Sequence, residues 1–452
     1  MNNSKYYEKV SVLEALKKGS IDIKLSALFM GFANLANKQI IKGLLFLLSE
    51  ILFLITFVLQ VIPSIHGLIT LGTQKAGEVV DPDTGITITV SGDNSFLFLL
   101  FGLAALIFCA VFAYIYWCNL KSARNLYVIK KEGLKAPSFK EDVATLSNSR
   151  FHMTMMAVPL LGVLVFTVLP LILTICLAFT NADKDHFPPG NLFSWVGFEN
   201  FGNIITGRMA GSFFPILSWT LIWAVFATVT NFFFGILLAL VINTKGLKFK
   251  KFWRTIFVFT IAVPLFISLL IMRNLLHPDG PLNELLKNWG LIQQSLPFLT
   301  DPTWAKFSII FVNMWVGIPY TMLVSTSIIM NLPQEQLEAA EIDGASKFQI
   351  FKSITFPQIL LIMTPTLIQQ FIGNINNFNV IYLLTGGGPV NPEFYQAGST
   401  DLLVTWLYKL SFESSRDYKL ASVIGILIFV LSATFSLIAY TRTNSYKEGA
   451  VK

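Results

Sequence analysis

Long runs of hydrophobic residues alternate with short polar segments along this chain. A helix rises about 1.5 Å per residue, so about 20 apolar residues are needed to cross a hydrocarbon core about 30 Å thick. The runs of this length lie at residues 43–65, 96–118, 155–179, 215–242, 256–276, 305–329, 360–385 and 421–440. The pattern therefore predicts an all-α polytopic membrane protein with eight transmembrane helices.

Several of these predicted spans contain prolines, namely Pro159, Pro170, Pro264, Pro319 and Pro365. Prolines are tolerated in membrane helices because neighbouring helices satisfy the freed carbonyl groups. The first span begins too far from Met1, after a lysine-containing segment, to be a cleavable signal peptide.

The basic residues are distributed unequally between the polar segments. If the N-terminus is cytoplasmic, 24 of the 33 Lys and Arg residues lie in cytoplasmic segments and seven in external ones. This asymmetry predicts that both termini are cytoplasmic. Residues such as Lys245, Lys248 and Arg254 then flank the membrane, so the net charge of +7 gives no reason to expect a nucleic-acid partner.

Composition supports a lipid environment. Hydrophobic residues make up 54% of the chain and charged residues 13%, whereas soluble proteins carry about 25% charged residues. Cys109, Cys118 and Cys176 all lie in apolar runs, where they favour neither a disulfide framework nor a metal site.

The segments outside the spans have distinct patterns. In the cytoplasmic segment 1–42, apolar residues recur at helical spacing from Asp22 to Lys42, which predicts an amphipathic helix lying along the membrane interface. The external loop 66–95 has a turn signal at Asp81 followed by alternating Thr and aliphatic residues, which predicts a small β-hairpin. Residues 119–154 form a charged cytoplasmic connector, and 441–452 a cytoplasmic tail.

The loop at 331–359 carries the most specific motif. Glu338 to Ile342 predicts a short helix, and Gly344 permits the positive φ that ends it. A second helical stretch places Phe348 and Phe351 near one face, and Pro357 is expected to end it at the membrane. An ordinary interfacial helix-turn-helix is the alternative interpretation.

The motif resembles the EAA loop of ATP-binding-cassette (ABC) importer permeases, and residues 331–359 are called the EAA loop below. In that family the loop forms coupling helices that seat on a nucleotide-binding subunit. The resemblance assigns coupling to Glu338, Ala339, Ala340, Asp343, Gly344, Ala345, Phe351 and Pro357. No GxxxxGK[ST] phosphate loop is present, so the chain is expected to be a transport subunit rather than an enzyme, with its ATPase on another polypeptide.

Further segments resemble the carbohydrate-uptake branch, most closely the larger permease of maltose and maltodextrin importers, over about residues 150–445. They are Val196–Phe201, Asn313–Tyr320, Asn376–Phe378, Leu383–Pro389 and Ala397–Leu403. The resemblance implies two extra helices at 43–118, before a six-helix core at 155–440. It also implies a second permease subunit, two ATP-binding subunits, an extracellular sugar-binding protein and an oligosaccharide substrate, with no cofactor. The enterobacterial form of this permease has a long folded insert after its third span, whereas the segment Thr180–Gly211 here is short. The resemblance therefore suggests the plasma membrane of a Gram-positive bacterium.

The seventh predicted span is unusually polar, with Gln369, Gln370, Asn374, Asn376, Asn377 and Asn379. Such a cluster faces a cavity or other helices, because polar groups in hydrocarbon are costly. Amides suit sugar hydroxyls, although amide bonding between helices is the alternative. The resemblance points to substrate contacts at Asn313, Gly317, Tyr320, Asn374 and Asn377. The chain departs from the maltose-type pattern at Ile261, Leu265 and Gly373.

An ion-coupled secondary sugar transporter acting alone is the competing class, and a membrane enzyme or a structural scaffold are more distant alternatives. An ion-coupled transporter predicts inverted repeats and paired acids in the membrane. Glu50 and Arg273 are instead isolated along the sequence, which favours a hydrogen-bonded or protonated packing residue and a snorkelling side chain. The identity and length of the sugar remain open at this level.

Overall fold

A computed structural model describes residues 10–80, 85–149, 151–188, 190–244, 246–413 and 416–442. The expected turn at Asp81, the anchor Lys245 and the tail beyond 442 lie outside these residues. The described chain is helical apart from one two-stranded sheet. It divides into two compact units, Met1–Trp195 and Val196–Lys452.

The first unit contains three helices long enough to cross a membrane. Two of them pass through a wide π-helical turn, written η. The elements are α5 (Ile40–Thr56), η1 (Phe57–Val61), α6 (Ile62–Thr70), α7 (Ser95–Lys131), α8 (Phe139–Ser147), α9 (Phe151–Val163), η2 (Leu164–Val168) and α10 (Leu169–Leu177). The strands β1 (Gly77–Val80) and β2 (Thr87–Val90) pair antiparallel, which confirms the hairpin.

The segment before α5 is not the single amphipathic helix that its apolar spacing predicted. It forms the short helices α2 (Val12–Lys18), α3 (Ile21–Leu25) and α4 (Phe32–Ala36), of which α3 and α4 are separated by a turn with Gly31 at φ +79°. The turn is held by side chains from other helices. Asn119 of α7 accepts from the Gly31 amide at 2.8 Å, and Glu50 of α5 accepts from the Met30 amide at 2.8 Å. Glu50 is therefore a hydrogen-bonded packing residue.

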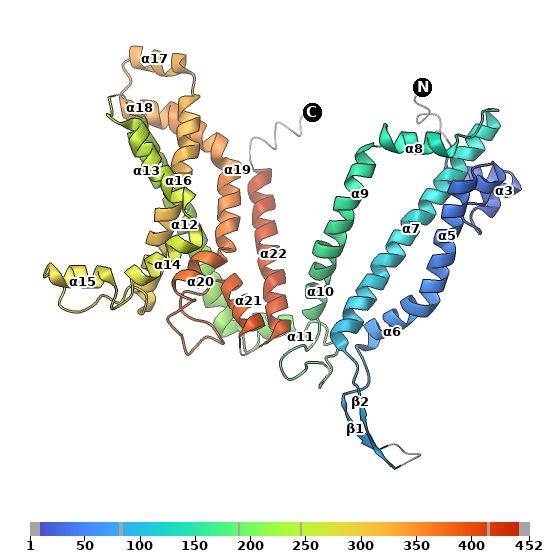
Figure 1. The fold of residues 1–452 in the computed structure, drawn as a ribbon. Helices are drawn as coiled ribbons and strands as arrows, with labels where there is room; N and C mark the ends of the chain where they lie inside the picture. Colours follow the sequence, from blue (N-terminus) through green and yellow to red (C-terminus); the bar gives the residue numbers. More distant parts are fainter. Residues whose placement is uncertain are drawn as a thin grey trace. The chain divides into compact units, whose positions relative to one another are not determined.

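The second unit holds the rest of the helices (Figure 1). They are α11 (Glu199–Ile205), α12 (Ala210–Asn243), α13 (Lys250–Ala262), α14 (Leu265–Leu275), α15 (Pro281–Asn288), α16 (Pro302–Met330), α17 (Gln334–Ile342), α18 (Lys347–Ile350), η3 (Phe351–Thr355), α19 (Phe356–Ile375), α20 (Phe378–Leu384), α21 (Leu403–Phe412) and α22 (Tyr418–Thr441). Within this unit, α17 and α18 lie at one end, and α20 and α21 at the other (Figure 1).

Among the residues that the structure describes, seven helical segments are long and apolar enough to cross a membrane, which confirms seven of the predicted spans in outline. The eighth predicted span, 256–276, is broken, so the prediction of a single helix there was wrong, although the bent pair α13 and α14 can count as one span. The chain bends by 93° between α13 and α14. Val263 is extended there, with ψ 128°, because the ring of Pro264 disfavours the helical conformation in the residue before it.

The predicted span 360–385 was also wrong at its far end. The helix ends at Ile375, and a new short helix, α20, begins at Phe378. The side chain of Asn377 caps α20 by accepting from the Val380 amide at 3.2 Å. An Asn side chain that satisfies a free backbone donor favours a new helix start over continuation.

Pro357 was expected to end the second helix of the EAA loop, but it does not. The helix runs from Lys347 to Ile375 through η3, and Pro357 follows that wide turn by two residues. Pro63 follows η1 and Pro170 follows η2 at the same spacing. A π-turn changes the carbonyl pattern ahead of the proline, so the helix continues despite the missing donor.

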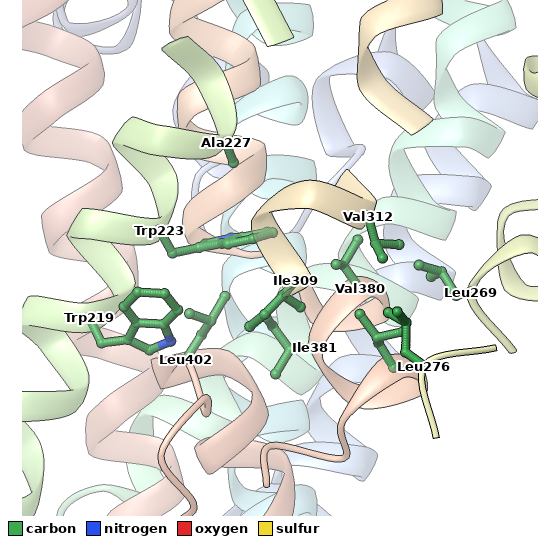
Figure 2. Packing of buried hydrophobic residues seen from close by; sticks show 11 residues of the cluster. Trp219, Trp223, Ala227, Leu269, Leu276, Ile309, Val312, Val380, Ile381 and Leu402 are labelled. Carbon is green, nitrogen blue, oxygen red and sulfur yellow. The ribbon is translucent and has the colours of Figure 1, made fainter. Parts of the chain in front are cut away.

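A cluster of buried hydrophobic residues fixes where the two breaks lie (Figure 2). Its members come from α12, α14, α16, α20 and the segment before α21, namely Trp219, Trp223, Ala227, Leu269, Leu276, Ile309, Val312, Val380, Ile381, Leu384 and Leu402. Both α14 and α20 follow a break directly. Their packing against α12 and α16 therefore brings the two breaks close together.

Candidate functional site

A cavity of about 660 Å³ lies where the two helix breaks meet. Its wall is drawn from α12, the α13–α14 bend, the middle of α16, and the α19–α20 break. Non-helical backbone at membrane depth is tolerated where it is buried or lines a cavity. The cavity therefore explains why the two helix breaks are tolerated, and the breaks in turn form part of its wall.

The cavity wall combines amides, hydroxyls and aromatic rings. Its polar and aromatic members are Asn231, Thr260, Ser268, Tyr320, Gln370, Asn374, Asn376, Asn377, Phe378 and Asn379. None of the described residues in the wall carries a charge. Amides and hydroxyls both donate and accept hydrogen bonds, and aromatic rings supply flat apolar faces. This chemistry suits an uncharged ligand with many hydroxyl groups.

Four of the five residues predicted to contact substrate line this cavity. They are Gly317, Tyr320, Asn374 and Asn377. Asn313 is absent from the wall. It is buried at 6% exposure, and in the described part of the chain its Nδ2 atom has no hydrogen-bond partner.

Asn374 and Asn377 are also held by hydrogen bonds within the protein. Asn374 Nδ2 donates to Thr228 Oγ1 at 3.0 Å, and the Asn374 carbonyl accepts from Trp223 Nε1 at 3.1 Å. Asn377 Nδ2 donates to Asn374 Oδ1 at 3.3 Å. Bonding between helices, which was the alternative interpretation, is therefore real for Asn374. It fixes the end of α19 on α12 at the cavity wall.

Asn231 of α12 is a cavity residue that the sequence analysis missed. Its amide lies directly on Gly317, so that a β-carbon at position 317 would collide with Asn231 Nδ2. Asn231 is 9% exposed, and its Oδ1 atom has no partner among the described residues. A buried acceptor without a partner beside the cavity is the kind of group that a bound ligand or water satisfies. The available signal was an amide within an otherwise apolar helix.

Ser268 is a second cavity residue that was missed. It lies three positions after Leu265, which also lines the cavity and at which the chain departs from the maltose-type pattern. Positions i and i+3 share a helix face. A hydroxyl-bearing residue is therefore present on α14, one turn further along.

The EAA loop lies at the other end of α16 and α19, and its conformation is set by local contacts. Gly344 has φ +78°, and the Ala345 amide donates to the Ala340 carbonyl at 3.0 Å as α17 ends. Ser346 and Gln349 form a reciprocal capping box at the start of α18. These features confirm the predicted helix, glycine turn and second helix.

Two large apolar side chains of the EAA loop are exposed: Ile342 at 86% and Phe348 at 70%. Phe351 differs from them, because it packs towards the helices, with its ring centroid 5.7 Å from that of Phe356. Large apolar side chains that are exposed on polar helices are typical of a surface that another protein covers.

The chain is similar in sequence to known transport proteins. Residues 231–445 match the family described as binding-protein-dependent transport system inner membrane component. The chain is 36% identical over 430 residues to the galactooligosaccharides transport system permease protein GanP of Bacillus subtilis (strain 168), covering 94% of this chain and 98% of that protein. It is 34% identical over 433 residues to the maltodextrin transport system permease protein MalC of Streptococcus pneumoniae serotype 4, covering 93% of this chain and 95% of that protein.

Among solved structures, the fold resembles a chain in a bacterial alginate ABC transporter in complex with an alginate pentasaccharide-bound periplasmic protein. The TM-score is 0.54 at 24% identity, over 66% of this chain and 96% of that chain. The fold, the missing phosphate loop and the relatives along almost the whole chain agree. The chain belongs to the family of membrane-spanning permease subunits of binding-protein-dependent ABC importers, which are not themselves ATPases.

Proposed function

We propose that this permease carries an uncharged oligosaccharide through the cavity at the two helix breaks. The observation that carries the proposal is the chemistry of the wall: amides, hydroxyls and aromatic rings, with no charged group among its described residues. Gly317, Tyr320, Asn374 and Asn377 are the proposed contacts, and Asn231 joins them. Asn313 would act from behind the wall, by packing.

The relatives narrow the substrate to two chemical groups. One relative is named for galactooligosaccharides and one for maltodextrin, at 36% and 34% identity. This difference is too small to choose between galactosyl and glucosyl chains. Uptake of each group of sugars by the complete transporter distinguishes the two.

The EAA loop would couple the cavity to ATP hydrolysis on partner subunits. Ile342 and Phe348 supply exposed apolar contacts for an ATP-binding subunit. The acidic and small residues Glu338, Ala339, Ala340, Asp343, Gly344 and Ala345 shape the loop, while Phe351 and Pro357 join it to α19. In this proposal both termini and the loop face the cytoplasm of a Gram-positive bacterium.

The complete transporter would contain a second permease subunit, two ATP-binding subunits and an extracellular sugar-binding protein. ATP-driven closure of the ATP-binding subunits would move the EAA loop and open the cavity alternately to each side. The continuous helix from Lys347 to Ile375 supports this proposal, because one end of it lies in the loop and the other in the cavity wall.

The test is uptake by the complete complex in proteoliposomes, with the binding protein outside and ATP inside. A panel of α-linked gluco-oligosaccharides and of galacto-oligosaccharides would be offered. We expect ATP-dependent uptake of one group. Uptake of charged solutes alone, or uptake by the single chain driven by an ion gradient without ATP, would contradict the proposal. The second result would favour a secondary transporter.

A further inference from the structure

Four aromatic rings form a continuous chain that begins at the cavity. Phe378 and Tyr382 lie on α20, and Tyr408 and Phe412 on α21. Ring centroids are 4.8 Å apart for Phe378 and Tyr382, 4.9 Å for Phe378 and Tyr408, 5.1 Å for Tyr382 and Tyr408, and 5.0 Å for Tyr408 and Phe412. These four residues are called the aromatic track below.

The track joins the cavity to the protein surface. Phe378 is part of the cavity wall, and Phe412 at the other end is 72% exposed. Tyr382 and Tyr408 are only partly buried. Rings that served only to pack the two helices together would be covered, as Trp406 is at 1% exposure.

The helix α21 is anchored through a different face. Leu403, Trp406 and Leu410 are buried, and Trp406 Nε1 donates to the Tyr395 carbonyl at 2.7 Å. Tyr408 and Phe412 are four residues apart, so they share a face of α21. On this face Thr405 is buried, whereas Tyr408 is only partly buried and Phe412 is exposed.

The loop between α20 and α21 holds the two helices in place. The Asp401 carboxylate is buried at 1% exposure and accepts from Lys409 Nζ and from the Gly398 amide, both at 2.7 Å. The hydroxyls of Thr385 and Thr400 are 2.9 Å apart. The rings are therefore positioned before any ligand arrives, which lowers the entropic cost of binding.

We propose that the aromatic track is a second sugar-binding site, which holds the pyranose rings of an oligosaccharide that extends beyond the cavity. Pyranose rings have apolar C–H faces, which stack on aromatic rings. Because Phe378 belongs to both sites, a single chain passes from one to the other. Short sugars occupy the cavity alone, and longer ones also contact the track.

A role in the membrane interface is the alternative, since Tyr and other aromatic residues gather at bilayer surfaces. The continuity with the cavity wall through Phe378 favours sugar binding. The two roles differ in what they predict. An interfacial anchor acts on the whole transporter, whereas the track acts only on substrates long enough to reach it.

The inference rests on the proposed transport of oligosaccharides, and its test compares chain lengths. The complete complex is reconstituted with saturating binding protein, and uptake is measured for a series from disaccharide to heptasaccharide of the linkage that the wild type transports. The variants are Tyr408→Ala and Phe412→Ala. Tyr408→Phe keeps the ring, and Phe307→Ala removes a ring of α16 that is similarly exposed, at 68%.

Tyr408→Ala and Phe412→Ala are expected to raise KM for the longest sugars about three- to tenfold, the size of one lost aromatic contact. Their KM for the disaccharide should match that of the wild type. For Tyr408→Phe and Phe307→Ala, KM should match the wild type both for the disaccharide and for the longest sugars. An equal change at every length would indicate an interfacial or folding role and overturn the track, as would no change. If the wild type takes up no oligosaccharide of any length, the proposed function itself fails.

Discussion

The two ends of the helix that runs from Lys347 to Ile375 are built in opposite ways. The EAA loop at its start is exposed and is shaped by contacts between residues close in sequence, such as the Ser346 capping box. The cavity at its end is shaped by contacts between distant residues, such as Asn374 with Thr228. One end offers a self-supporting surface to another protein, and the other is formed only when four segments pack together.

This difference matters for coupling. A helix of 29 residues is about 43 Å long at about 1.5 Å per residue, so one element reaches from the loop to the cavity. The end of α19 is tied to α12 through Asn374 and Trp223. A displacement of the EAA loop would therefore move the cavity wall through η3 and α19.

The largest expected effect comes from removing the two exposed apolar residues of the EAA loop. The double variant Ile342→Ser with Phe348→Ser should lose about 3–6 kcal/mol of contact with the ATP-binding subunits, given about 1.5–3 kcal/mol for burying each side chain. Co-purification of those subunits with the permease measures this. The control is Val390→Ser, since Val390 is 87% exposed in the loop after α20. This variant should keep the ATP-binding subunits bound. Retention of the subunits in the double variant would contradict the docking role.

A smaller effect is expected in the cavity. Asn231→Leu removes the only amide that α12 contributes to the cavity wall. If this amide bonds a sugar hydroxyl, the loss of about 1–3 kcal/mol should raise KM for uptake about five- to 150-fold. Thr230→Val is the control. It removes a neighbouring hydroxyl that donates to the Phe226 carbonyl within α12 and is not part of the cavity wall. Equal KM values in both variants would remove Asn231 from the site.

The turn of the EAA loop should be sensitive to backbone strain alone. A β-carbon at Gly344 would meet open space, so Gly344→Ala costs only the left-handed conformation, about 1–2 kcal/mol. We expect sugar-stimulated ATP hydrolysis to fall while basal hydrolysis persists. Gly133→Ala carries the same strain, with φ +67° and open space, but lies after α7. If both variants lose stimulation equally, the loss reflects general destabilisation.

The smallest expected effect is at the cap of α18. Ser346→Ala removes one half of a capping box and should destabilise the second helix of the loop by about 1 kcal/mol. The expected result is a modest fall in stimulated ATP hydrolysis, with Ser346→Thr close to the wild type. Thermal unfolding of the whole complex should hardly change, because the cap is local. A large shift in that transition would show that the loop is not self-supporting.

The class of protein, seven of the eight spans and the EAA loop were predictable from the amino-acid sequence. These features depend on runs of apolar residues, on Gly344 at a positive φ and on capping residues that act within a few positions of themselves. Local physics also predicted the hairpin between β1 and β2. Of the five proposed substrate contacts, four came from the family resemblance, namely Gly317, Tyr320, Asn374 and Asn377. The fifth, Asn231, came from the structure.

The positions at which the long helices break depend on how the helices pack. Pro264 stands at a 93° bend, whereas Pro319 and Pro365 lie inside helices that continue. A proline weakens a helix wherever it stands, and packing decides whether the chain bends there. Asn231 entered the cavity wall for the same reason, because its neighbour Gly317 belongs to another helix. A linear sequence does not state which helix faces which, and the cavity exists only once that is settled.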